Sequence, residues 1–241
     1  METSEGGLLG GRVRYAQPCR GFRSGIEPVL LAAAVPARIG ERVLEAGSGA
    51  GAALLCLAAR VPGISGVGVE RDGELAALAR RNAAANGFLG LEFVAAAIAG
   101  ASPLGGFDHA LANPPYHPPT GTTSPDSMRR LAKQGSPELL GEWAGAMAAC
   151  LHRRATLTLI VRDAALPSAL AALAAADCPA SALFPLWRRT GDPAKLVLLR
   201  GVKGGRGPFR VLTGLALHGA DGSFTPAADA VLREGAGLDL G

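Results

Sequence analysis

The chain has 241 residues, of which 49% are hydrophobic and 18% charged, and its formal net charge is +4. This length suggests a single domain, and the apolar content is enough for a buried core, which excludes intrinsic disorder as the main state. No apolar run approaches the roughly 18 residues of a membrane-spanning helix, and the acidic start is unlike a secretory signal, so we expect a cytoplasmic protein without a membrane anchor.

Short β-type runs alternate with alanine-rich segments through most of the chain, a pattern typical of βαβ units around a parallel sheet. Five runs predict strands, at residues 42–46, 66–70, 91–94, 108–112 and 156–161. Four segments predict amphipathic helices, at residues 52–60, 73–85, 138–151 and 164–176. We therefore expect a Rossmann-like, doubly wound α/β fold.

The pattern changes after residue 177. Residues 181–187 and 195–199 predict two strands joined by the polar turn 189–193, which favours an antiparallel hairpin at the sheet edge. Residues 209–217 form one more apolar run. No internal repeat or long linker divides the chain, so these parts belong to one domain.

A glycine-rich turn follows the first predicted strand. The sequence Glu45-Ala46-Gly47-Ser48-Gly49-Ala50-Gly51 runs from that strand into a predicted helix. Glycines let the backbone bend sharply and let a ligand approach the main chain, so a nucleotide-bearing cofactor can lie over the helix N-terminus. Turns of this kind also occur for packing reasons in α/β proteins.

Two acidic residues flank this turn in the predicted sheet. Glu70 ends the second strand, 19 residues after Gly51, where a carboxylate can accept hydrogen bonds from both ribose hydroxyls of an adenosine cofactor. A solvated charge at a strand end is the alternative for Glu70. Glu45, just before the first glycine, disfavours a pyrophosphate and suits a positively charged sulfonium with its amino-acid tail.

The tetrapeptide Asn113-Pro114-Pro115-Tyr116 directly follows the fourth predicted strand, at the edge where open α/β sheets bind ligands. Two prolines hold backbone carbonyls in a stiff geometry, and with the Asn113 side-chain oxygen these carbonyls can accept hydrogen bonds from a planar NH2 group. Tyr116 offers a flat face on which a base or an amide can stack. A rigid proline turn with a surface tyrosine is the structural alternative.

At these residues the sequence resembles the class I S-adenosylmethionine-dependent methyltransferases with an N/D-P-P-Y motif, which methylate exocyclic or amide nitrogens. The resemblance covers roughly residues 8–200 and implies a seven-stranded, mostly parallel sheet with an antiparallel edge hairpin. It implies S-adenosylmethionine as the cofactor, with Asn113, Pro114, Pro115 and Tyr116 as the catalytic residues. The cofactor-binding residues that it implies are Glu45, Gly47, Ser48, Gly49, Gly51, Glu70, Arg71, Ala97 and Asn113.

A narrower resemblance comes from the segments at residues 9–14, 17–18 and 21–31. They are similar to the arm that precedes the cofactor loop in the tRNA1(Val) adenine-37 N6-methyltransferase family, where the arm folds over the cofactor. Pieces at 113–119 with Gly121 and Ser124-Pro125, and at 193–195, 203–208 and 222–226, are also similar to that family. This implies an arm over residues 1–41, a cofactor-binding methyltransferase domain over 42–200, and a C-terminal extension over 201–241 packed on the same domain.

Two positions depart from the family pattern. Glu27 stands where the family more often has Asp, a small change in carboxylate reach. Ala97 stands after the third strand, where the superfamily usually carries an acid that accepts a hydrogen bond from the cofactor's adenine amine. Losing one such bond typically costs about 0.5–1.5 kcal/mol, so cofactor binding is weakened but not abolished.

An RNA substrate fits the basic residues of the C-terminal part. Between residues 185 and 210 there are seven basic residues and one acidic residue. Phosphate contacts supply most of the affinity for RNA, and the target adenine must be splayed out to reach a stacking face. Solvated surface charge is the alternative for such a run. The candidate substrate and RNA contacts are Tyr116, His117, Arg188, Arg189, Lys195, Lys203 and Arg206, with Arg129, Arg130 and Lys133 as further candidates.

We therefore expect a methyltransferase that acts on a planar exocyclic amine, with adenine N6 in tRNA as the first hypothesis and a monomer or weak homodimer as its state. Methyl transfer from a sulfonium is an in-line displacement, so we expect no metal, and four scattered cysteines predict neither a zinc site nor a disulfide. One alternative is a protein glutamine N5-methyltransferase, because an amide NH2 is the same kind of donor. A second, motivated by Ala97, is a non-catalytic RNA-binding protein on a methyltransferase scaffold.

Overall fold

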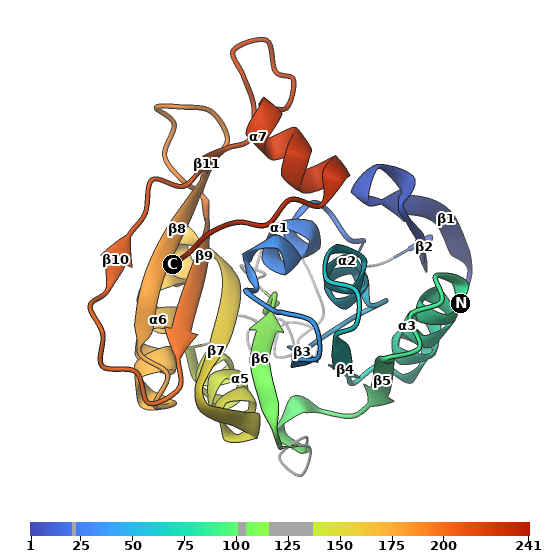
Figure 1. Ribbon diagram of the computed structural model, residues 1–241, viewed down its shortest axis with the longest axis horizontal. Helices are drawn as coiled ribbons and strands as arrows, with labels where there is room; N and C mark the ends of the chain where they lie inside the picture. The colour runs from blue at the N-terminus through green and yellow to red at the C-terminus, as the bar shows by residue number, and fades with distance from the viewer. Residues whose placement is uncertain (21–22, 101–104, 116–136) are drawn as a thin grey trace, which may run out of the picture.

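The computed structural model describes residues 1–20, 23–100, 105–115 and 137–241. Its centre is a nine-stranded sheet in the order β10-β8-β9-β7-β6-β3-β4-β5, with β11 also paired to β8 (Figure 1). The strands are β3 Arg42–Ala46, β4 Ser65–Glu70, β5 Leu91–Ala95, β6 Phe107–Ala112, β7 Leu151–Arg162, β8 Ala180–Trp187, β9 Leu196–Val202, β10 Arg210–Val211 and β11 Leu215–Ala216.

The predicted Rossmann-like fold is confirmed. The seven expected strands form the sheet from β5 to β8, and among them β9 alone runs antiparallel to its neighbours β7 and β8. The sheet is wider than expected, because the apolar run at 209–217 contributes two short strands, β10 and β11, which both pair in parallel with β8. Strand β7 begins at Leu151, five residues before the predicted start, directly after the preceding helix.

Helices cover both faces of the sheet (Figure 1). One apolar cluster joins α1 Glu27–Ala34, α2 Ala52–Arg60 and α3 Gly73–Ala85 to one face, and a second joins α5 Pro137–Cys150 and α6 Leu166–Ala175 to the other. Helices α2 and α3 have the predicted bounds, and α6 is preceded by a 3-10 turn at Asp163–Ala165. Within the residues described, no helix has the length and apolar character needed to cross a membrane.

The N-terminal segment forms a hairpin that the sequence analysis did not predict. Strands β1 Thr3–Leu8 and β2 Val13–Pro18 pair antiparallel in a sheet of their own, joined by a 3-10 turn at Leu9–Gly11. Strand β1 is mostly exposed, whereas Val13 and Tyr15 of β2 are buried. The hairpin lies beside α2 and α3, and its strand β2 contacts both helices (Figure 1).

The C-terminal segment returns across the same face of the molecule. After β11 it forms α7 Pro226–Asp229 and a π-helical turn at Ala230–Glu234, then passes in front of α1 (Figure 1). The Leu238 amide donates to the carbonyl of Ala33 in α1 at 2.8 Å, and the Arg12 guanidinium donates to the Glu234 carbonyl. The extension therefore packs on the α/β domain and touches the turn of the N-terminal hairpin.

Candidate functional site

The residues predicted to carry the chemistry come together at the carboxyl edge of the central strands. Ala46 of β3 pairs with Ala112 of β6 on one side and with Val69 of β4 on the other. Gly47, Glu70 and Asn113 each come one residue beyond these pairs, so three neighbouring strands present them along one edge. This arrangement is the crevice in which open α/β sheets bind ligands.

The turn after β3 depends on its glycines. Gly47, Gly49 and Gly51 have φ angles of 66°, 54° and 90°, a region that disfavours residues with a side chain. Gly47 also lies against the indole of Trp143 on α5, and a Cβ on Gly51 would lie 2.9 Å from the Phe93 ring. Backbone shape and close packing both require glycine here.

Glu70 is tied to this turn. Its Oε2 accepts a hydrogen bond from the Gly49 amide at 2.9 Å, and its Oε1 accepts one from the Asp72 amide at 2.9 Å. Apart from its two chain neighbours, no heavy atom of the described residues lies within 4 Å of the position that a Cβ on Gly49 would take. As far as these residues show, the outer side of the turn is open immediately beside a carboxylate.

Glu45 lies beneath the turn and is only 5% exposed. Its Oε2 accepts a hydrogen bond from the Leu54 amide in the first turn of α2, at 3.2 Å. Burial raises the pKa of Glu45 from 4.5 to about 8; the charge of Glu70 raises it further and the Leu54 hydrogen bond opposes the rise. This carboxyl group is thus poised to ionise near neutral pH.

The N-terminal hairpin reaches the same region through Tyr15. Its side chain is 5% exposed, and its hydroxyl lies 2.8 Å from Ser24 Oγ. Burial raises the pKa of Tyr15 to about 12, against the effect of the Ser24 hydrogen bond, and the nearby charge of Glu45 contributes to the rise. Tyr15 is therefore a neutral, buried side chain close enough to Glu45 to feel its charge.

The proline-rich segment is described as far as Pro115. Asn113 and Pro115 are half-buried and Pro114 is buried at the end of β6. Tyr116 and His117 lie outside the described residues, as do Arg129, Arg130 and Lys133.

Three other predicted cofactor contacts differ in their placement. The Ser48 hydroxyl is buried, lies close to Gly68 of β4, and has no hydrogen-bond partner among the described residues, so it is held between the turn and the sheet. Arg71 and Ala97 are exposed at the same edge as Glu70. The Ala96 amide donates to the Glu70 carbonyl at 2.9 Å, which brings Ala97 next to that acid without supplying a side-chain acceptor.

The predicted RNA contacts separate into two groups. Arg188, Arg189 and Lys195 are exposed between β8 and β9, at the carboxyl edge that holds the glycine turn. Because β9 runs antiparallel, its far end places Lys203 and Arg206 at the opposite edge. There the Lys203 ammonium lies 3.5 Å from the Asp177 carboxylate and donates to the Ala176 carbonyl just after α6. The structure does not bring these two groups together.

Three side chains that the sequence analysis did not single out touch the glycine turn. Trp143 and Phe93 pack on its glycines, and Asn82 of α3 donates a hydrogen bond to the Ala50 carbonyl at 2.9 Å. The sequence signal for Asn82 is weak: an amide side chain in an otherwise alanine- and arginine-rich helix. Among the residues that the structure describes, no three His, Cys, Asp or Glu side chains gather as a metal site would require.

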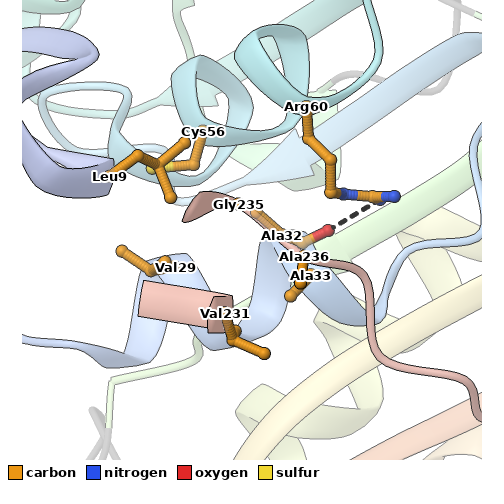
Figure 2. Close-up of a pocket in the computed structure, with 9 residues that line it drawn as sticks. All are labelled: Leu9, Val29, Ala32, Ala33, Cys56, Arg60, Val231, Gly235 and Ala236. Carbon is orange, nitrogen blue, oxygen red and sulfur yellow. Dashed lines mark hydrogen bonds between the residues drawn. The ribbon is translucent and has the colours of Figure 1, made fainter. Parts of the chain in front are cut away.

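A small cavity lies elsewhere, between α1, α2 and the C-terminal segment (Figure 2). It has a volume of about 10 Å³ and is lined mainly by apolar groups, among them Leu9, Val29 and Cys56. The Arg60 guanidinium reaches across it and donates to the Ala32 carbonyl at 3.1 Å, at the end of α1. Ligand sites are tens of times larger, so this cavity is a packing void and not a second site.

The sequence is similar to those of known methyltransferases. Residues 27–157, more than half of the chain, match the family model described as methyltransferase small domain. The chain is 30% identical, over 85% of its own length and 86% of the relative's, to a tRNA1(Val) (adenine(37)-N6)-methyltransferase of Aeromonas hydrophila.

Solved structures share the fold. A predicted O-methyltransferase from Agrobacterium tumefaciens superposes with a TM-score of 0.72 at 24% identity, covering 88% of this chain and 98% of that one. A precorrin-6y C5,15-methyltransferase from Geobacter metallireducens gives 0.55 at 14% identity, covering 78% and 92%. A magnesium protoporphyrin IX methyltransferase from Synechocystis, solved with bound S-adenosylmethionine, gives 0.50 at 16% identity, covering 68% and 71%.

Proposed function

The chain belongs to the methyltransferase small domain family and is an S-adenosylmethionine-dependent methyltransferase, and from this premise we propose that its substrate is the N6 amine of an adenine in tRNA. The observation that carries the proposal is the position of Asn113-Pro114-Pro115 at the end of β6, one strand from the glycine turn. The name of the curated relative, a tRNA adenine-N6 methyltransferase, supports the choice of an adenine amine.

The residues at the strand ends fit the cofactor. The space that the described residues leave over Gly49 lies beside the Glu70 carboxylate, which is where a ribose with two hydroxyls can be held. We assign Glu70 to the ribose, and Glu45 with Gly47, Gly49 and Gly51 to the charged end of the cofactor. When bound, the cofactor supplies an electrophilic methyl group on a sulfonium sulfur.

The part of the protein that follows β6 orients the amine. Asn113 Oδ1 and the carbonyls of Pro114 and Pro115 accept hydrogen bonds from the two N–H groups of a planar amine. A nitrogen whose two protons are held in one plane has its lone pair directed out of that plane, toward an electrophile on one side. We propose that Tyr116 stacks on the base and that His117 contacts the substrate next to it.

The tRNA itself is proposed to lie across the carboxyl edge. Arg188, Arg189 and Lys195 are exposed on the side where the target base must enter, and we assign them to phosphate contacts. Lys203 and Arg206 lie at the far edge, and we do not assign them to the RNA contacts.

The N-terminal arm completes the proposed site. Tyr15 of the hairpin packs against the region of Glu45, and residues 1–41 are proposed to cover the cofactor's side of the crevice. The extension over residues 201–241 is proposed to serve as a support, because it packs on α1 and on the hairpin turn.

The test is transfer of labelled methyl groups to total tRNA from a strain that lacks the gene, followed by nucleoside analysis. The expected product is N6-methyladenosine. Label found only in protein would show that the planar amine is a glutamine amide instead. A folded protein that gives no binding heat at millimolar S-adenosylmethionine would identify a non-catalytic scaffold.

A further inference from the structure

Asn82, in the last turn of α3, joins two segments that are far from it in the sequence. Its side chain is buried, at 3% exposure. The Nδ2 group donates to the Ala16 carbonyl in β2 and to the Ala50 carbonyl in the glycine turn, both at 2.9 Å, and Oδ1 accepts from the Ala16 amide at 3.0 Å. Both amide protons of this side chain are therefore used, and they connect the arm to the turn.

Asn86, one helical turn later, repeats half of this pattern. Its Oδ1 accepts from the Arg14 amide at 2.8 Å and its Nδ2 donates to the Arg14 carbonyl at 2.7 Å. Residues 14 and 16 present their backbone groups on the same side of β2, and residues 82 and 86 share one face of the helix. The two asparagine side chains thus bond to backbone groups along one edge of β2, as the backbone of a neighbouring strand would.

The difference between the two asparagines lies at the turn. The second proton of Asn82 reaches Ala50, whereas that of Asn86 returns to the Asn82 carbonyl at 2.7 Å within the helix. Ala50 lies between Gly49 and Gly51. The Gly49 amide donates a hydrogen bond to Glu70, and Gly51, with a φ of 90°, is the N-cap residue of α2. Two successive residues of the turn are therefore fixed by side chains, one by Glu70 and one by Asn82.

We propose that Asn82 is a positioning residue for S-adenosylmethionine: it holds the glycine turn in its cofactor-accepting shape and couples that shape to the seating of the N-terminal arm. The inference rests on the turn being the cofactor site and is independent of the substrate. Without Asn82, the Ala50 carbonyl loses its buried partner, and the turn can relax into other shapes that must be reversed before cofactor binds.

The test compares Asn82→Ala with Asn86→Ala in the full chain, by calorimetric titration with S-adenosylmethionine and with S-adenosylhomocysteine, without RNA. Both variants loosen β2, so both are expected to lower the melting temperature. Only Asn82→Ala is expected to weaken binding of both compounds, by tenfold or more. Its amide hydrogen exchange at residues 49–51 is also expected to accelerate, while exchange there in Asn86→Ala stays at the wild-type rate.

Steady-state kinetics add a readout that general destabilisation does not move. Asn82→Ala is expected to raise KM for S-adenosylmethionine at least tenfold, with kcat at saturation within threefold of wild type. Asn82→Ser keeps a hydroxyl but is too short to bridge Ala16 and Ala50, and is expected to behave like Asn82→Ala. It is the variant to use if the alanine variant does not fold.

Three results would overturn the inference: equal loss of affinity in the Asn82 and Asn86 variants, unchanged affinity in a folded Asn82 variant, or failure of both Asn82 variants to fold while Asn86→Ala folds. The last would show a purely structural role. Wild-type protein that binds S-adenosylmethionine but does not methylate tRNA would refute the proposed function and leave this inference standing.

Discussion

The Gly49 amide donates a 2.9 Å hydrogen bond to the Glu70 carboxylate, which links the end of β4 to the turn that follows β3. Its other oxygen accepts from Asp72 at the start of α3. One carboxylate therefore sets both the shape of the turn and the charge beside it, and removing that charge acts on both.

Glu70→Gln is expected to weaken S-adenosylmethionine binding about tenfold. Hydrogen bonds to a charged acceptor contribute about 1.5–3 kcal/mol and those to a neutral one about 0.5–1.5 kcal/mol, and the difference is near the 1.4 kcal/mol of one decade. Titration calorimetry measures the effect. Glu92→Gln, on the exposed face of β5, is the control, and an equal loss in both variants would contradict the role of Glu70.

Glu45 is expected to make the protein less stable as pH rises. Its folded pKa is about 8 against an ordinary 4.5, so between these values the native state keeps a proton that the unfolded state has released. The free energy of unfolding then falls with increasing pH, by at most about 1.4 kcal/mol per unit. Urea denaturation from pH 5 to 8 should show this fall in the wild type and a flatter profile in Glu45→Gln.

The same group should couple cofactor binding to proton release. A positively charged ligand favours the ionised form of Glu45, so binding at pH 7 expels a proton. Calorimetry in two buffers of different ionisation enthalpy detects the proton, and Glu45→Gln should abolish the buffer dependence. Identical buffer dependence in the variant would show that another group is responsible.

Asn113→Ala is expected to lower kcat by a hundredfold or more while S-adenosylmethionine affinity stays within about twofold. The lost acceptor orients the amine during transfer, and losses of this kind appear mainly in kcat. Asn113→Asp keeps a side-chain oxygen and should retain more activity than the alanine variant. A parallel loss of turnover and cofactor affinity in Asn113→Ala would argue against an orienting role.

Ala97→Asp is expected to strengthen S-adenosylmethionine binding. Ala97 is exposed beside Glu70, and an acid there gains an acceptor for an amine proton, about 0.5–1.5 kcal/mol or two- to tenfold in affinity. Ala99→Asp, exposed in the 3-10 turn that follows, adds the same charge at another place and should leave affinity unchanged. No gain in Ala97→Asp would show that the cofactor's adenine does not lie at this position.

The double variant Arg188→Glu with Arg189→Glu is expected to raise KM for tRNA at least tenfold without changing cofactor affinity. Both residues are exposed at the carboxyl edge, and each lost phosphate contact should reduce the salt dependence of binding by about one unit of slope. Arg206→Glu, exposed at the opposite edge, is the control. Equal effects of the variants at the two edges would contradict the assignment of the RNA contacts to the carboxyl edge.

The central fold could be predicted from the sequence because its signals are local. The bounds of β3, α2 and α3 match the expected ranges to the residue, since short apolar runs, the N-cap at Asp72 and the glycine at 87 define each element without distant help. The pattern also predicted parallel strands whose carboxyl ends share one edge, which is why Gly47, Glu70 and Asn113 were expected at the same ligand-binding edge.

The hairpin could not be predicted in this way. Strand β1 is glycine-containing, polar and mostly exposed, so it lacks the apolar alternation of a strand. Strand β2 is held by the side-chain amides of Asn82 and Asn86, which come 66 and 72 residues after their partners in the sequence. Asn82 was missed for the same reason, because its role depends on partners that no local window contains.

The basic run between residues 185 and 210 illustrates a further limit. Counting charges along the chain ignores the direction of β9, whose two ends lie at opposite edges of the sheet. In its middle, Arg200 is 3% exposed and donates to the carbonyls of Ala34 and Gly241 inside the fold. Arg200, although counted in the basic run, is therefore a buried residue that bonds to the backbone inside the fold.

The contact between the hairpin turn and the C-terminal extension bears on how the chain folds as it is made. Arg12 donates to a carbonyl 222 residues later, at Glu234, and Gly10 lies close to Arg233. The ribosome releases the hairpin first, whereas Arg233 and Glu234 can contact the hairpin only after that later stretch has been synthesised. Such high contact order makes closure of the arm a late event, after the α/β sheet has already assembled.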